Sequence, residues 1–111
     1  MRPPVLPLLA ALPLLAGCAR GDLTPPELYA DHCARCHGPR GEGKPRALKL
    51  YPHVDLHASP MSREGNREAI RMRIEEGAGP MPAFKRRLTP AEIAKLVDYT
   101  IRLSRSPKED P

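Results

Sequence analysis

The stretch Cys33-Ala34-Arg35-Cys36-His37 decides the fold of this chain of 111 residues. It has the form C-x-x-C-H, which is typical of the attachment of a c-type haem. Thiols three positions apart project from the same side of a helical turn, so each can add across one vinyl group of the porphyrin. A neutral imidazole at His37 can then bind the iron. The motif therefore predicts one covalent haem c, its proximal ligand and a redox function.

A C-x-x-C pair has two other common uses, as a thiol–disulfide redox motif and as half of a zinc site. The redox motif expects a thioredoxin-like βαβ pattern, which this sequence lacks. A zinc site needs a second pair of ligands, and Cys18 is the one other cysteine. Haem attachment is therefore the preferred interpretation.

Residues 1–17 are interpreted as an export signal. Arg2 precedes an apolar run over residues 5–16, which is shorter than the roughly 20 residues that a membrane span needs. The run ends in Leu14-Leu15-Ala16-Gly17-Cys18, which resembles the lipobox of bacterial lipoproteins. The resemblance implies cleavage before Cys18 and several acyl chains on that residue, which would anchor the chain stably. The alternative is an ordinary signal peptide, with Cys18 incidental.

Export would place the chain where c-type haem is attached, outside the cytoplasm. The lipid on Cys18 would hold it at the outer face of the cytoplasmic membrane or at the periplasmic side of the envelope. All three cysteines are then used, two on haem and one on lipid, and no disulfide is expected. With one Phe, three Tyr and no Trp, the protein core is thin, and a buried porphyrin must supply much of the apolar contact.

After the signal, the chain divides into a tether over residues 18–23, a single domain over 24–104 and a polar tail over 105–111. The domain opens with Thr24 as N-cap, Pro25 at the first helical position and Glu27 closing a capping box. This helix is expected to run to about Cys36.

The middle of the domain holds one further helix. Residues 44–61 are basic and punctuated by proline, and we expect an irregular stretch wrapped around the cofactor. Asn66 can cap a helix over residues 67–76, with Gly77 as its stop.

The last helix repeats the opening pattern of the first. Thr89 is its cap and Glu92 closes a second capping box, so the helix is expected to run from Pro90 to about Leu103. Its apolar stripe consists of residues 93, 96, 97, 100 and 101.

Met81 is the candidate for the second iron ligand, because it stands between two prolines on a stiff, non-helical loop. Met61, in a loop after a proline, is the stronger of two rival methionines, and Met72 is more typical of packing or surface. His53 and His57 offer bis-histidine ligation or a surface metal site, although such histidines are more often solvated or near a haem propionate. His32 is expected to be a surface residue that points away from the iron.

The order C-x-x-C-H-G, then M-P-x-F over residues 81–84, then Leu96-Val97-Asp98-Tyr99 is similar to a class I c-type cytochrome of the small bacterial monohaem kind. The resemblance covers nearly the whole exported domain. It implies an all-α, cytochrome c-like fold of three to four helices around one covalently bound haem. Its site residues would be the thioether anchors Cys33 and Cys36, the proximal iron ligand His37 and the distal iron ligand Met81.

The same resemblance implies three packing features. Tyr29 would pack against Leu96 and Tyr99 of the last helix. The family usually has glycine where this chain has Pro25, which implies a slightly altered helix crossing. The proximal imidazole would donate its other N–H to a proline carbonyl, for which Pro45 and Pro52 are both candidates.

Ligation by His37 and Met81 leaves no open coordination site, so we expect one-electron transfer and an electron carrier rather than an enzyme, with no small-molecule substrate. The soft thioether and burial both favour Fe(II) and raise the reduction potential. The preferred function is a membrane-tethered carrier between extracytoplasmic redox partners in respiratory electron transfer. The alternatives are a dedicated electron-accepting subunit of an extracytoplasmic dehydrogenase and, if Met81 is displaceable, a haem-based ligand sensor.

The chain has a net charge of +5, and its basic residues gather in two stretches. Lys85-Arg86-Arg87 follows the Met81 loop, and four more cations follow the attachment motif at positions 40, 44, 46 and 49. Both stretches could rim an exposed haem edge and dock an acidic patch on a redox partner. An ordinary basic surface is the alternative, and nucleic acid is a poor candidate partner outside the cytoplasm.

Overall fold

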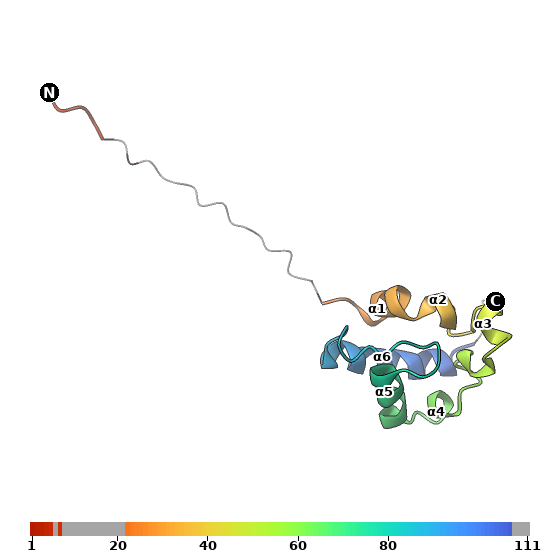
Figure 1. The fold of residues 1–111 in the computed structure, drawn as a ribbon. Coiled ribbons are helices and arrows are strands. Elements are labelled where there is room, and N and C mark those ends of the chain that lie inside the picture. Colours follow the sequence, from red (N-terminus) through yellow and green to blue (C-terminus); the bar gives the residue numbers. More distant parts are fainter. Residues whose placement is uncertain (6, 8–21, 108–111) are drawn as a thin grey trace.

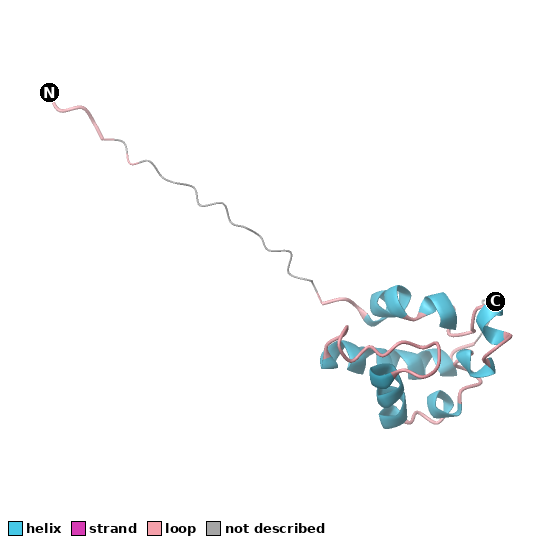
Figure 2. Ribbon diagram, in the orientation of Figure 1, coloured by secondary structure: helices cyan, strands magenta, loops and turns pink. Residues whose placement is uncertain are grey.

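The computed structural model describes residues 1–5, 7 and 22–107. Within these ranges the chain is helical and forms no strand; an isolated antiparallel bridge pairs Ala78 with Met81 (Figure 2). The all-α expectation is confirmed. Cys18 and its predicted lipid site lie outside the described residues. In chain order the helices are α1 (Pro25–His32), α2 (Ala34–His37), α3 (Pro45–Leu48), the 3-10 helix η1 (Pro52–Val54), α4 (Pro60–Arg63), α5 (Arg67–Glu76) and α6 (Pro90–Arg105).

Both predicted capping boxes form. The Thr24 side chain accepts from the backbone N–H of Glu27, whose carboxylate accepts in turn from the backbone N–H of Thr24. Thr89 and Glu92 make the same pair at the start of α6. Each box satisfies two backbone donors that the first helical turn leaves without partners. These local bonds explain why both helix starts could be predicted to the residue.

Helix α5 also matches its predicted bounds. The Asn66 side chain accepts from the backbone N–H of Ala69 at its start. At its end, Gly77 has φ +70°, and a Cβ there would collide with the Met81 carbonyl oxygen. Glycine therefore both ends the helix and lets the Met81 loop pass close to it.

Two helix ends differ from the predictions. The first helix does not continue to Cys36, because Cys33 departs from helical geometry, with φ −119°, and divides it into α1 and α2. The last helix runs two residues beyond Leu103, to Arg105. The buried Ser104 hydroxyl there lies 2.7 Å from the Ile101 carbonyl and 3.0 Å from the Ser62 carbonyl, which fixes the end of α6 against α4.

The stretch over residues 44–61 is more ordered than predicted. It contains α3 and η1 and leads into α4, and each of these short helices begins with proline. Proline is pre-organised for the first helical position and lacks the N–H that would need a partner there. The prolines that were interpreted as interruptions are thus helix starts.

Helix α6 is the centre of the fold, and α1, α4 and α5 all pack against it (Figure 1). Tyr29 of α1 meets Tyr99 of α6 edge to face, with ring centroids 5.2 Å apart. Tyr29 and Leu96 are only 2% and 1% exposed, so the predicted contact of α1 with α6 is confirmed. The buried apolar core consists of Leu28, Tyr29, Leu56, Ile70, Ile74, Phe84, Leu88, Ile93, Leu96 and Val97.

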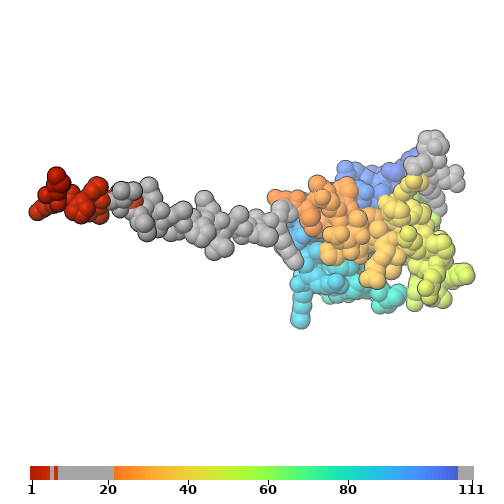
Figure 3. All heavy atoms as spheres, turned by 90° about the horizontal axis from the view of Figure 1, so that it is seen from above, coloured from red at the N-terminus to blue at the C-terminus, as the bar shows by residue number. Residues whose placement is uncertain are grey.

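Seen from above, α1 and α2 (orange) lie over α6 (blue) and beside the yellow-green segment that carries α3 and η1 (Figure 3). His37 of the attachment motif thereby contacts Val54, 17 positions further along the chain. None of the helices that the structure describes is long and apolar enough to cross a membrane.

Candidate functional site

A hollow of about 170 Å³ brings most of the predicted site residues together. Cys33, His37 and Met81 all line it, and so does the rival methionine Met61. These four residues come from the attachment motif, the loop after α5, and α4. The fold therefore brings residues from three separate segments to one hollow. Two thioethers, one imidazole and one thiol form a donor set that suits haem iron and its covalent attachment.

The contact made by one ring nitrogen of His37 leaves the other nitrogen suited to bind a metal. Its Nδ1 lies 2.8 Å from the backbone carbonyl oxygen of Val54. A carbonyl only accepts, so Nδ1 carries the proton and Nε2 keeps its lone pair for a metal. Burial lowers the pKa of His37, and the bond to Val54 opposes this shift only in part. The imidazole is therefore held in the neutral form that binds iron.

The expectation that a proline supplies this carbonyl is wrong. The Pro52 carbonyl accepts from the Asp55 N–H, and the Pro45 carbonyl accepts from the Lys49 N–H. Both prolines start short helices, so their carbonyls are used within those helices. Val54 ends η1, and its carbonyl is directed to the imidazole.

The two cysteines differ in their surroundings. Cys33 is half-buried and lines the hollow, and burial raises the pKa of its thiol to about 12. Cys36 is exposed. The N–H groups of Cys36 and His37 both approach the Cys33 carbonyl, at 3.2 and 3.0 Å, so the motif forms one tight turn. This geometry fits a porphyrin held by one sulfur in the wall and one at the rim.

Met81 is held in place by its own backbone. Its N–H donates to the Ala78 carbonyl at 2.9 Å, and its carbonyl accepts from the Ala78 N–H at 3.1 Å. The half-buried side chain packs against the core and lines the hollow. Its neighbouring prolines restrict the loop further. A pre-positioned thioether therefore faces the same hollow as the His37 imidazole.

The rival ligands divide into those inside the hollow and those outside it. Met61 and His53 line it, whereas Met72 is 52% exposed on the surface of α5. His57 contacts the Asp55 carboxylate at 3.0 Å and the Ser106 carbonyl at 2.9 Å. Within the described ranges no group of three His, Cys, Asp or Glu residues could hold a separate metal ion. Of the i, i+4 histidine pair, His53 lines the hollow and His57 does not.

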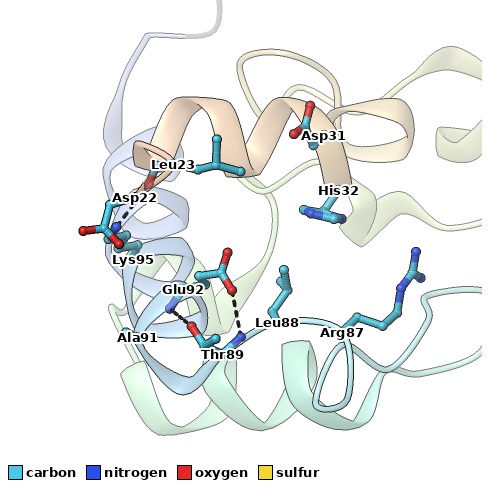
Figure 4. A pocket seen from close by; sticks show the side chains of 10 residues that line it. All are labelled: Asp22, Leu23, Asp31, His32, Arg87, Leu88, Thr89, Ala91, Glu92 and Lys95. Atoms are coloured by element: carbon cyan, nitrogen blue, oxygen red, sulfur yellow. Dashed lines mark hydrogen bonds between the residues drawn. The ribbon is translucent and has the colours of Figure 1, made fainter. Parts of the chain in front are cut away.

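A larger hollow of about 630 Å³ lies along α1, between that helix and the start of α6 with the loop before it (Figure 4). His32 lines it and packs edge to face on Phe84, with centroids 5.7 Å apart, so this histidine is half-buried rather than a surface residue. Lys95 donates to the Leu23 carbonyl at 3.1 Å across one end. Neither the attachment cysteines nor Met81 lines this hollow, so the smaller one is the candidate site on chemical grounds.

Two residues of the site were missed at the sequence level. Val54 contributes a backbone carbonyl, which no side-chain pattern reveals. Arg73 lines the hollow from α5, one position before the buried Ile74. Its place on the face of the helix that carries Ile70 and Ile74 was a usable signal.

Comparison with known proteins identifies the class. Residues 22–99 match the family described as cytochrome c oxidase, cbb3-type, subunit III. The chain belongs to this family of c-type cytochromes, whose cofactor is a covalent haem c, and Cys33 and Cys36 fit its attachment motif.

Particular relatives agree with this assignment. The chain is 32% identical to cytochrome c6 of Gloeothece citriformis over 75 residues, which is 68% of this chain and 64% of that protein. It is 31% identical to cytochrome c6 of Euglena viridis over 85 residues, covering 73% and 91% of the two chains. The solved structure of the KustC0563 c-type cytochrome superposes with a TM-score of 0.63 at 29% identity, over 73% of this chain and 98% of that one. The chain thus spans slightly less than two thirds of the first of these relatives.

The buried hydroxyl of Tyr29 should stabilise the attachment turn. It donates to the Gly38 carbonyl at 2.6 Å, and burial raises the pKa of Tyr29 far above its ordinary value, so the phenol keeps its proton. In Tyr29→Phe the Gly38 carbonyl keeps only the longer bond from the Gly41 N–H, at 3.2 Å. We therefore expect a loss of about 1–2 kcal/mol in the free energy of unfolding. Denaturant unfolding of the haem-loaded protein measures this change in free energy.

Tyr99→Phe is the matched control, because this half-buried ring packs against Tyr29 and its change should stay within about 0.5 kcal/mol. Equal losses in the two variants would contradict a specific role for the Tyr29 hydroxyl.

Proposed function

We propose that this chain is a one-electron carrier and not an enzyme. Cys33 and Cys36 hold the haem by thioether bonds, His37 is the proximal iron ligand and Met81 the distal one. The observation that carries the proposal is that a neutral imidazole and a pre-positioned thioether line the same hollow as the Cys33 thiol.

The haem supplies a one-electron Fe(III)/Fe(II) couple when bound. The chain's own residues determine how that couple behaves. His37 and Met81 would both bind the iron, which would leave no coordination site for oxygen or substrate. The thioether and the apolar walls, such as Leu56 and Ile70, favour the less charged ferrous state and so raise the reduction potential.

Replacing the distal ligand tests this proposal. Met81→Ala removes the thioether, so we expect the absorption spectrum of a six-coordinate His/Met haem to disappear and the midpoint potential to fall. Optical redox titration of the purified haem protein measures both. Met61→Ala, in the same hollow, and Met72→Ala, on the surface, are the controls and should keep the spectrum of the unaltered protein.

A Met81→Ala protein with an unchanged spectrum and potential would refute the assignment. Loss of the thioether signal in Met61→Ala alone would transfer the distal role to Met61.

We further propose that the carrier is exported and tethered to the membrane by a lipid on Cys18. The support is the sequence Leu15-Ala16-Gly17-Cys18 at the end of an apolar run. Several acyl chains on one residue would give stable anchoring without a membrane-spanning helix.

Fractionation of cells tests the tether. Cys18→Ser removes the sulfur that would carry the lipid, so we expect the haem protein to move from the membrane fraction to the soluble fraction. Ala19→Ser, one residue beyond, is the control and should stay with the membrane. A Cys18→Ser protein that still pellets with membranes to the same extent as the unaltered chain would exclude this anchor.

The exposed basic residues support a redox partner with an acidic patch. Lys44, Arg46 and Lys49 are exposed on and around α3, and Lys85 and Arg86 are exposed after the Met81 loop. Opposite charges on a partner would speed the encounter and lose their effect as salt rises. These residues do not line the haem hollow itself, so they would act at its outer rim.

A second candidate function is a dedicated electron-accepting subunit of an extracytoplasmic dehydrogenase. It is favoured by two adjacent apolar side chains, Leu50 and Tyr51, which are 72% and 48% exposed. Large apolar side chains at a permanent interface would be covered by the partner. A freely diffusing carrier does not require a permanent apolar interface.

Native electrophoresis of detergent-solubilised membranes, stained for haem, separates the two functions. A carrier that acts as a shuttle migrates alone, and Leu50→Ser with Tyr51→Ser leaves its mobility unchanged. A dedicated subunit migrates with a larger complex and is released by the double substitution. Met72→Ser, which alters another exposed apolar side chain, is the control.

A further inference from the structure

The candidate haem hollow contains one arginine. Arg73 lines it from the last turn of α5. The titratable residues that share its walls are Tyr29, Cys33, His37 and His53, and no Asp or Glu lines the hollow. A permanently charged guanidinium thus borders a site whose described walls contain no carboxylate to balance it.

The other cations on α5, and Lys85 in the loop that follows Met81, already have partners. Arg67 pairs with Asp98 of α6. Arg71 pairs with Glu68 and, at 2.7 Å, with Glu75. Lys85 lies 3.4 Å from Glu76.

All three carboxylates of α5 are therefore matched with a cation other than Arg73. In the part of the chain that the structure describes, no carboxylate pairs with the Arg73 guanidinium.

Haem brings two carboxylates of its own, the propionates. A carboxylate that is partly withdrawn from water needs a cation and hydrogen-bond donors. The planar guanidinium presents two parallel N–H groups that match a carboxylate, and it stays charged at any physiological pH. The Arg73 guanidinium and a haem propionate are thus complementary in charge and in hydrogen-bonding geometry.

We propose that Arg73 binds a propionate of the haem and, through that contact, raises the reduction potential of the iron. This inference rests on the proposed haem site. The charge of a free propionate favours the ferric state, which carries more positive charge than the ferrous one. Arg73 offsets that charge and so favours the ferrous state. It also lowers the pKa of the propionate, because an opposite charge stabilises the ionised form.

A purely local role for Arg73 has to be separated from this one. A cation in the last turn of a helix interacts favourably with the helix dipole, and Arg73 is exposed enough to be solvated. That role needs no haem and would affect the stability of the helix without changing the potential. The potential and its dependence on pH therefore decide between the two roles.

The experiment is a redox titration of the haem-loaded protein from pH 5 to pH 9 for three variants. Arg73→Gln should increase the equilibrium constant for oxidation by a fixed mediator about tenfold, which for a one-electron couple is a fall of about 59 mV in midpoint potential. The pH-dependent part of the curve should move to higher pH, because the propionate pKa rises. Arg73→Lys keeps the charge and should stay closer to the unaltered protein than Arg73→Gln does.

Arg67→Gln is the matched control, since it removes the same charge from the same helix at a residue that does not line the hollow. Coincident titration curves for Arg73→Gln and Arg67→Gln would overturn the inference. A six-coordinate His/Met spectrum in both variants would show that the proposed function survives that failure.

A second measurement needs no substitution. Redox difference infrared spectra of the unaltered protein contain the carboxylate bands of the propionates. Labelling arginine with ¹⁵N shifts the C–N bands of a guanidinium, so label-sensitive guanidinium bands should appear in the difference spectrum if Arg73 is bonded to a propionate whose surroundings change with the iron. A difference spectrum without label-sensitive bands would overturn the inference even if Arg73→Gln failed to fold.

Discussion

The hydrogen bond from His37 Nδ1 to the Val54 carbonyl joins two parts of the chain that are 17 positions apart. The intervening segment is fastened to the attachment turn by further backbone bonds. The Gly43 N–H donates to the His37 carbonyl at 2.6 Å, and the Leu56 N–H donates to the Gly41 carbonyl at 2.7 Å. The imidazole is consequently oriented, with its proton assigned, by protein contacts alone. The His37 imidazole and the segment that carries Val54 therefore form one structural unit.

The parts of this structure that could be predicted from the sequence depend on neighbouring residues. The capping boxes at Thr24 and Thr89 and the glycine stop at Gly77 use contacts within a few positions, and all three are found where they were expected. The Val54 carbonyl was not predicted, because it meets His37 across 17 positions of the chain. The break at Cys33 was not predicted either, although its backbone bonds are to residues within four positions. Arg73 was missed because the hollow that it lines is formed by segments distant in the chain.

Helix α6 serves the protein core and the cofactor site at once. Leu96 and Val97 are buried in the core, while Thr100, one turn further along, lines the candidate haem hollow. The packing of α1 on α6 through Tyr29 and Tyr99 therefore also positions one wall of that hollow. A group bound there stabilises the folded state by mass action. The thin aromatic content of the chain is consistent with a fold whose centre is completed by the porphyrin.

The prolines of this chain would affect the rate at which the proposed carrier exchanges an electron. In the part of the chain that the structure describes, five of the seven helical segments begin with proline. Two of these, η1 and α4, contribute residues to the lining of the hollow, and α3 directly precedes them. Fixed φ angles leave such a wall few alternative conformations. When the iron changes its charge, surroundings of this kind rearrange little. For the proposed carrier this would mean a small reorganisation energy, set by the backbone of the wall rather than by any single side chain.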